Sequence, residues 1–484
     1  MKNNLSEWQR LSPVSVLVFF IKVIRFNWTA IPLVYVSLKD LELSFVSWVL
    51  VGVLLSLITC VIAYIRYLNF KFRCDETDVH IQSGVFSKTN QSISFDRIQT
   101  LKTEQNLIFK QFNLVKVELD TAGSSGSEVS LPVVAYSVYE SLNDLIYTEA
   151  NVVDVDKNES TRYTYSLKDY ILTGLTSNRM FIVIAGIYGT YTAYSEQLSD
   201  LSGIQLENEV DVLSNKVSEL SYEFLIVLGI LFLFLFIAFS VLGAGLFFYK
   251  LDIRFKNEVI DKAQGFFSRS KNVLKSKKVQ TITLSRNVFH KLLSGYKLVI
   301  KQASTTDDLS LNQQFLVPFL NPQLRDQIIA FLFPSVKLDD VHYKKIDRSY
   351  MFITNRNYVW LPSLICIGVS AYNQFLLWYA SFAWLIIGTV VVYRKYLSYA
   401  YSINSDFVYK KSGVFGDKLT FAETFKVQSV QFKQSPYQRQ KKLATLLVSF
   451  ASETLIIPYI SLQEATEYSE FILNEVTSTQ KKWF

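Results

Sequence analysis

The sequence predicts a multi-pass α-helical membrane protein with three repeats, each made of two membrane spans and a small β-rich cytoplasmic domain. Composition, apolar runs and a repeated motif support this fold class. Hydrophobic residues make up 50% of the 484 residues and charged residues only 19%, against about 25% in soluble domains. The mean hydropathy is +0.21. A net charge of +7 is modest for this length, so nucleic acid is not an expected partner.

Apolar runs indicate the membrane spans, because a bilayer core of ~30 Å needs about 20 mostly apolar residues in a helix. Six runs qualify, in three pairs: 19–38 and 44–65, 178–194 and 224–248, and 358–372 and 375–393. The first member of each pair is weaker, since it is short or carries basic residues at its entry end. Lys22, Arg25 and Arg179 can extend to the headgroups there. We therefore expect six spans, and neither buried helices of a soluble core nor a cleaved signal peptide.

Charges beside the spans predict the orientation. Between the third and fourth spans, residues 195–222 carry six acidic residues and a single Lys216, so this loop is expected outside the cell. Basic residues follow the second, fourth and sixth spans, beginning at Arg66, Lys250 and Arg394. We therefore expect a bacterial cell-membrane protein with both termini and all three polar segments in the cytoplasm.

One motif occurs in each of the three polar segments. It reads G-x-F, ten further residues, and then [RK]-[IV]-Q. The motif residues are Gly84, Phe86, Arg97 and Gln99 in the first copy, Gly265, Phe267, Lys278 and Gln280 in the second, and Gly413, Phe415, Lys426 and Gln428 in the third. A turn between strands often needs a positive φ, which glycine adopts with little strain, so these glycines are predicted to be structural. Because spans separate the copies, we expect a glycine substitution to affect its own domain.

Strands and a final helix follow the motif in each copy. Period-two alternation predicts strands at 114–119, 296–300 and 446–450, and each copy then reaches an apolar residue followed by Pro132, Pro318 or Pro458. Helical spacing appears at 136–150, 321–333 and 461–476. Asn321 and Ser461 are predicted N-caps, and Pro322 suits the first helical position. Six or seven short strands and one helix describe a small barrel or sandwich.

These patterns divide the chain into six parts. The predicted boundaries are 13–65 for the first transmembrane hairpin, 66–150 for the first domain, 166–248 for an interfacial helix and the second hairpin, 249–334 for the second domain, 346–393 for an interfacial helix and the third hairpin, and 394–476 for the third domain. Stretches 11–25, 167–178 and 346–356 mix apolar and basic residues, which suits helices at the cytoplasmic interface. The middle domain differs by a polar insertion at 303–310.

The repeated motif and the apolar-proline step resemble bacterial pleckstrin-homology (PH-like) membrane proteins of the YdbT type. The resemblance covers nearly the whole chain, and its layout is three copies of span, span and PH-like domain. It implies a fold and no reaction. It also implies a membrane-anchored protein of a kind often found beside a shorter companion with one PH-like domain.

The basic and polar motif residues have two interpretations. In the structural one, the branched residue faces the core while the basic residue and glutamine face outward or bond a neighbouring strand. In the functional one, they bind lipid headgroups or a partner strand. A basic run in the middle domain supplies candidate contacts for anionic inner-leaflet lipids, with a solvated loop as the alternative. The run consists of Arg269, Lys271, Lys275, Lys277 and Lys278.

No catalytic, cofactor or metal site is predicted. The sequence contains no phosphate-binding, nucleophile-elbow or zinc-protease motif. Cys60, Cys74 and Cys366 have no usable ligand spacing. His80, His290 and His342 are expected to be surface or strand residues. An enzyme is therefore the disfavoured class.

Two functions remain open. The first is a non-enzymatic, membrane-anchored scaffold at the inner leaflet, in cell-envelope maintenance or stress defence with a companion membrane protein. The second is a transporter or lipid-translocating protein. Ion-coupled transport usually needs acidic residues or histidine inside the membrane, and the clearest spans have none.

Overall fold

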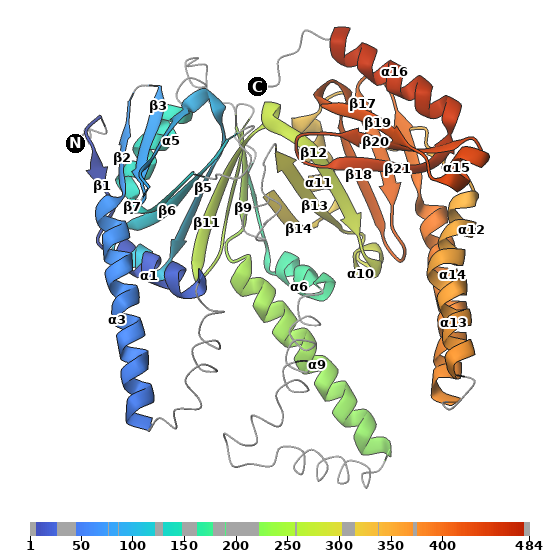
Figure 1. The fold of residues 1–484 in the computed structure, drawn as a ribbon, viewed down its shortest axis with the longest axis horizontal. Helices are drawn as coiled ribbons and strands as arrows, with labels where there is room; N and C mark the ends of the chain where they lie inside the picture. Colours follow the sequence, from blue (N-terminus) through green and yellow to red (C-terminus); the bar gives the residue numbers. More distant parts are fainter. Residues whose placement is uncertain are drawn as a thin grey trace.

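Three long apolar helices leave the same side of a row of β-rich domains in the computed structural model (Figure 1). The structure describes residues 6–26, 45–75, 77–85, 87–121, 129–147, 162–177, 189, 222–256, 259–302, 315–336, 338–370 and 375–478. The predicted acidic loop, most of the predicted spans 19–38 and 178–194, and the polar insertion lie outside these residues.

The long helices are α3 (Phe45–Asn69), α9 (Tyr222–Phe247) and α14 (Phe375–Ser398). Each contains an apolar stretch long enough to cross a membrane. Leu50 and Phe234 are 63% and 66% exposed, which in water would leave a large apolar surface uncovered. A bilayer covers such a surface. The prediction of long apolar helices at 44–65, 224–248 and 375–393 is therefore confirmed.

A second helix packs against each long one. These helices are α1 (Ser15–Phe26) against α3, α6 (Leu167–Thr176) against α9, and α13 (Leu361–Ser370) against α14. A short π-helix, η6 (Arg356–Trp360), joins α12 (Ser349–Asn355) to α13 without a break. At Gly174 of α6 an added Cβ would lie 2.5 Å from Val241 Cα. Helices α1, α6 and α12 thus lie in the three stretches where a helix is expected before each hairpin.

Each domain is a sandwich of a four-stranded and a three-stranded sheet with a C-terminal helix. Domain 1 contains β1 (Gln9–Arg10), β2 (Lys71–Cys74), β3 (Asp78–Ser83), β4 (Thr89–Ser94), β5 (Ile98–Asn106), β6 (Leu114–Thr121), β7 (Val129–Ala135) and α5 (Tyr136–Tyr147). Domain 2 contains β8 (Arg162–Thr164), β9 (Asp252–Lys256), β10 (Val259–Gln264), β11 (Ser268–Lys275), β12 (Val279–Arg286), β13 (Tyr296–Gln302), β14 (Phe315–Leu320) and α11 (Pro322–Leu332). Domain 3 contains β15 (Lys344–Lys345), β16 (Ala400–Ile403), β17 (Phe407–Ser412), β18 (Asp417–Glu423), β19 (Ser429–Lys433), β20 (Leu443–Ser449), β21 (Thr454–Ser461) and α16 (Leu462–Ser478).

The sheets continue from one domain into the next (Figure 1). Strand β5 of domain 1 pairs with β11 of domain 2, and β12 of domain 2 pairs with β18 of domain 3, both antiparallel. Two seven-stranded sheets result, with the orders β7-β6-β5-β11-β10-β9-β8 and β14-β13-β12-β18-β17-β16-β15. We call these two contacts the first and second joints. The long helices separate the domains along the chain, but backbone ladders connect all three, which argues against the expectation that each domain is independent of its neighbours.

Both joints use the same register. Leu101 faces Val273 in the first, and Ile282 faces Phe421 in the second. In each case the first residue stands four positions after the motif's basic residue, and its partner stands eight positions after the next domain's glycine. A shift of one residue would turn every side chain to the other face.

The hydrophobic cores of domains 1 and 2 are each completed by the domain that follows. Val273 of domain 2 belongs to the core of domain 1, and Phe407, Tyr409 and Phe421 of domain 3 belong to the core of domain 2. The ring centroids of Phe333 and Phe407 lie 5.2 Å apart. Removing a following domain would therefore expose part of the preceding core.

Local sequence explains the repeated turns. Gly84, Gly265 and Gly413 have φ of 110°, 110° and 148°, and an added Cβ at each would lie about 2 Å from a backbone oxygen. The positive φ expected at these three turn glycines is confirmed. Asn321 accepts a hydrogen bond from the amide of Leu324, Ser461 accepts one from the amide of Glu464, and Pro322 opens α11, as predicted.

The repeated proline falls at a β-bulge in all three copies. The register of β6 with β7, of β13 with β14 and of β20 with β21 shifts where Pro132, Pro318 and Pro458 stand. Proline has no amide hydrogen for the ladder, so a bulge is where a strand tolerates it.

Candidate functional site

The hairpin turns at the motif glycines lie against the ends of the long helices. The Gly265 and Phe266 amides donate to the carbonyls of Tyr249 and Leu246, at the end of α9. Ser398 Oγ, at the end of α14, donates to the Gly413 carbonyl. Phe267 and Phe415 are 55% and 61% exposed beside these contacts. Phe86 is outside the described residues. The phenylalanine of the motif thus reaches solvent at the side from which the spans leave.

Two short helices add apolar side chains to the same side. Helix α4 (Leu107–Gln111) packs through Phe109 against Val14 and Val18 of the α1 segment, and α10 (Val288–Leu292) contacts α6. Their outward residues are exposed: Leu107, Ile108 and Phe112 around α4, and Val288, Phe289 and Leu292 on α10. We call these six residues, together with Phe266, Phe267 and Phe415, the span-side rim. The repeated motif does not reach α4 and α10, although their N-caps, Asn106 and Asn287, share a position in the repeat.

The second half of the motif lies at the joints. Ile98, Val279 and Val427 are buried in the three cores. Lys426 is also buried, and its Nζ donates to the carbonyls of Lys277 and Val279 in domain 2, at 3.0 and 2.6 Å.

The basic motif residues differ in exposure along the row. Burial lowers the pKa of Lys426, and its ion pair with Glu423 at 2.7 Å opposes that shift. Arg97, which has no preceding domain, is exposed, and Lys278 is half-buried. The basic residue of the last copy therefore bonds a neighbouring strand, one of the two interpretations left open.

Further polar contacts fasten the second joint. Arg286 and Lys291 of domain 2 form ion pairs with Asp417 of domain 3 at 2.7 and 2.9 Å. Burial opposes ionisation of Asp417, but the two cations outweigh it and hold the pKa of the carboxyl below its usual range. Glu453 of domain 3 accepts from Thr281 Oγ1 at 2.8 Å and pairs with Lys301 at 3.1 Å.

The basic run of the middle domain is a strand and not a loop. Arg269, Lys271 and Lys275 lie on β11, which is paired on both sides, while Lys277 and Lys278 lie in the 3-10 turn after it. The eight residues of β11 extend over about 25 Å. Of the five, Arg269 is the closest in sequence to Phe266 and Phe267 of the rim, and it pairs with Gln105 just before α4. The five cations are therefore spread along a strand and the turn after it.

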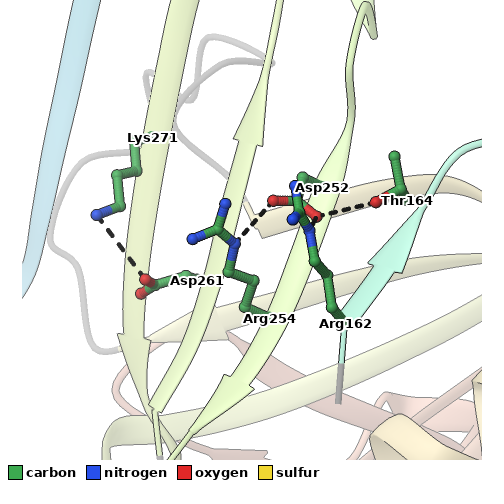
Figure 2. Close-up of polar contacts among 6 residues, drawn as sticks. All are labelled: Arg162, Thr164, Asp252, Arg254, Asp261 and Lys271. Atoms are coloured by element: carbon green, nitrogen blue, oxygen red, sulfur yellow. Dashed lines mark hydrogen bonds and ion pairs between the residues drawn. The ribbon is translucent and has the colours of Figure 1, made fainter. Parts of the chain in front are cut away.

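Lys271 is engaged at the first joint. Its Nζ lies 3.8 Å from Asp261 Oδ2 (Figure 2). The same Nζ lies 5.9 Å from the ring centre of Tyr139 in domain 1. On the neighbouring strands, Arg162 and Arg254 donate to Asp252 at 2.7 and 2.8 Å.

Arg162 and Arg254 stabilise the ionised carboxylate of Asp252. Burial opposes its ionisation, but the two guanidinium groups keep the pKa of the carboxyl low. The cluster fastens the short strand β8 to β9, so its role is structural.

Two cavities open near the rim. One, of 690 Å³, lies between α1, α3 and the turn of Gly84, with Lys22 and Arg66 beside apolar Phe19 and Ile65. The other, of 510 Å³, lies at the second joint and is lined by Arg286, His290, Asp417 and residues of α6. Each combines an apolar wall with cations, an arrangement able to hold an anionic group attached to an apolar chain.

The glutamines and histidines fall in different surroundings. Gln280 is buried and Gln428 is exposed, while the side chain of Gln99 is not described. His290 is buried on α10, with Nδ1 at 2.7 Å from Asn287 Oδ1 and Nε2 at 3.1 Å from the Pro318 carbonyl. The expectation of a surface or strand position is wrong for His290, which instead ties the N-cap of α10 to the proline bulge.

Reactive groups in the described parts of the chain are few. No group of three His, Cys, Asp or Glu that could hold a metal occurs among those residues. Burial raises the pKa of the Cys74 thiol to about 12, which makes it unreactive. Lys262 is buried in domain 2, where it donates to the Leu316 carbonyl, and burial lowers its pKa to about 7.

The fold and the span-side rim define a membrane protein with three PH-like sandwiches in a row. The family described as "Bacterial PH domain" matches residues 18–150, 211–332 and 358–476, and the chain belongs to this family. It is of the YdbT type. The UPF0699 transmembrane protein YdbT of Bacillus subtilis (strain 168) is 23% identical over 500 residues, covering 97% of this chain and 98% of that protein.

A shorter relative matches part of the chain. The UPF0699 transmembrane protein YdbS of Bacillus subtilis (strain 168) is 30% identical over 96 residues, which cover 20% of this chain and 58% of that protein. The matched length is close to that of one PH-like domain.

Proposed function

We propose that the chain is a non-enzymatic, membrane-anchored scaffold whose three PH-like domains form one rigid row at the inner leaflet and bind a shorter companion of the same family. In this proposal all six predicted apolar runs span the membrane, and both termini are cytoplasmic. The observation that carries the proposal is the pair of joints in one register, because shared strands fix the spacing of the domains.

The span-side rim supports a location at the membrane surface. Nine exposed apolar residues at the ends of the spans suit the boundary between headgroups and acyl chains. Lys22 and Arg66 in the 690 Å³ cavity would attract anionic headgroups, each contributing about 1 kcal/mol. In this proposal Arg269 is the one cation of the basic run that reaches the leaflet.

A probe that reports contact with lipid tests this location. A polarity-sensitive fluorophore on Leu292→Cys, in the full chain in nanodiscs, should be quenched by brominated lipids. The same fluorophore on Asp406→Cys is the control. Equal quenching at both positions, or none at Leu292→Cys, would contradict the proposed placement.

Co-purification tests the scaffold itself. The full chain, extracted in mild detergent from cells that also produce a tagged one-domain family member, should elute with it in a fixed ratio. Failure of the two proteins to associate in detergent and in nanodiscs would remove the companion from the proposal.

A further inference from the structure

The two ends of the row differ in the side chains along their edge strands. At one end β4 is the edge of its sheet, and at the other β19 is the edge of its sheet, among the residues that the structure describes. Strand β4 corresponds to β11 and β18, and β19 corresponds to β5 and β12. Each end therefore shows half of a joint that the chain builds twice.

The β19 edge is apolar where a joint would cover it. Val430 and Phe432 correspond to Ile282 and Leu284, which face β18 at the second joint and are 0% and 4% exposed. Helix α16 contacts β19 and leaves Val430 half-buried, but Phe432 is 44% exposed.

Two further positions are also exposed on β19 but buried at the second joint. Gln428 and Gln431 are exposed, whereas Gln280 and Thr283 at the equivalent positions are 1% and 7% exposed. The end of domain 3 thus keeps the residues of a joint without a covering domain.

The β4 edge is polar at the corresponding places. Asn90 and Ser92 are exposed and stand where β18 has Leu419 and Phe421. In the register of the joints, Ser92 of a second chain would face Val430, and Asn90 would face Phe432. Two amide or hydroxyl groups would then lose water against apolar side chains without a hydrogen-bond partner on that face, which is unfavourable. A second copy of this chain is therefore a poor partner for β19.

From this asymmetry we propose that β19 is a docking edge for the fourth strand of a PH-like domain on another polypeptide. The strand adds to the sheet as β18 adds to β12, with its apolar residue eight positions after the turn glycine facing Val430. Main-chain hydrogen bonds hold the strand, and Val430 and Phe432 select an apolar partner, as in other cases of strand addition. This inference rests on the proposed scaffold function and gives its companion a site and a register.

The test uses full-length chains and an engineered probe. The probe carries Asn90→Leu and Ser92→Val, which give β4 the apolar residues of the joints, and Phe432→Lys, which blocks its own β19. Mixed in detergent with the wild-type chain, the probe should form a one-to-one pair. When the wild-type chain, here called the acceptor, carries Phe432→Lys, it should bind the probe at least tenfold more weakly. A chain with Leu145→Lys, which changes an exposed leucine of α5 in domain 1 outside the span-side rim, should bind like the wild type.

Cysteines report the register. Lys433→Cys in the acceptor and Thr89→Cys in the probe should form a disulfide, because these positions face each other in the joint register. The same cysteine pair in chains with an otherwise wild-type β4 should not link. Head-to-tail linkage of such chains would make a second copy the partner and overturn the proposal. Absence of any complex with the probe would overturn recognition at this edge.

The outcome is separable from that of the scaffold proposal. If a one-domain family member co-purifies with the chain and Phe432→Lys leaves that association unchanged, the scaffold stands and the β19 site is wrong. If no such protein co-purifies but the probe pairs through β19, the edge is competent and the companion is wrong.

Discussion

The first joint pairs β5 with β11 over seven residue positions, whereas the second pairs β12 with β18 over five. The shorter ladder carries the larger side chains, with Phe333 packed against Phe407 and Phe421. It also has ion pairs of Asp417 with Arg286 and Lys291. The shared register shows that the backbone ladder is the constant part of a joint. Side chains then provide stability in different ways.

The largest expected effect comes from the aromatic contact of the second joint. Phe421→Ala should destabilise domain 2 as well as domain 3 by about 3–5 kcal/mol, because this fully buried ring stands on β18 of domain 3 and its loss leaves a cavity in the core of domain 2. Hydrogen exchange with mass spectrometry would measure the opening free energies of α11 and of β20. Val273→Ala is the matched change at the first joint and should cost domain 1 about 1–3 kcal/mol. Destabilisation confined to domain 3 would contradict the shared core.

A buried cation in the domain between the joints should make its stability depend on pH. Lys262 has a pKa of about 7 in the folded chain and about 10.4 when unfolded, so the unfolded state binds more protons between these values. Stability of domain 2 should therefore rise by about 2–3 kcal/mol from pH 7 to pH 9 and level off below pH 7. Lys262→Ile, which installs the residue found at Ile81 in domain 1, should abolish this rise. Hydrogen-exchange rates corrected for pH would measure this dependence of stability on pH. The same dependence in Lys262→Ile as in the wild type would mean that another group causes it.

Turn glycines should distinguish a strand inside a joint from a free strand. Gly265→Val strains the turn before β11, so we expect domains 1 and 2 each to lose about 1–3 kcal/mol. Gly84→Val strains the turn before β4, which has no partner domain, and should affect domain 1 alone. Limited proteolysis of the full chain would locate the new cleavage sites. Cleavage restricted to domain 2 in the Gly265→Val chain would argue against coupling through the joint.

The ion pairs of the second joint should have the smallest effect. Asp417→Asn should cost about 1 kcal/mol or less, because the side chains are partly exposed. The difference from wild type should shrink as salt rises from 0.05 to 0.5 M, since exposed charges are screened over ~10 Å at 0.1 M. Thermal melting of both proteins in detergent at the two salt concentrations measures this difference in stability. A loss that does not change with salt would mean that Asp417 acts through packing.

The sequence predicted what depends on local chemistry. The positive φ of Gly84, Gly265 and Gly413 followed from the needs of a tight turn, and the caps at Asn321 and Ser461 followed from side-chain oxygens before a periodic stretch. Period two also located the strands, because it reports which face of a strand is buried.

Period-two alternation does not show which other strand pairs with a strand edge. Strands β4 and β11 both precede the basic motif residue, yet β4 is an edge while β11 is paired on both sides. The basic run was therefore expected as a loop or a lipid contact, although Lys271 is held at a joint. Lys426 and Lys262 were equally hard to predict as buried, since lysine is almost always exposed.

A register-specific cross-link tests the continuous sheet most directly. In the full chain without its native cysteines, Thr103→Cys with Lys271→Cys joins residues that face each other across the first joint. We expect an intramolecular disulfide to form rapidly in the membrane. The pair Thr103→Cys with Arg269→Cys, displaced by two residues along β11, should link much more slowly. Equal linking of the two pairs, or linking of neither while both chains remain folded, would contradict a shared sheet in this register.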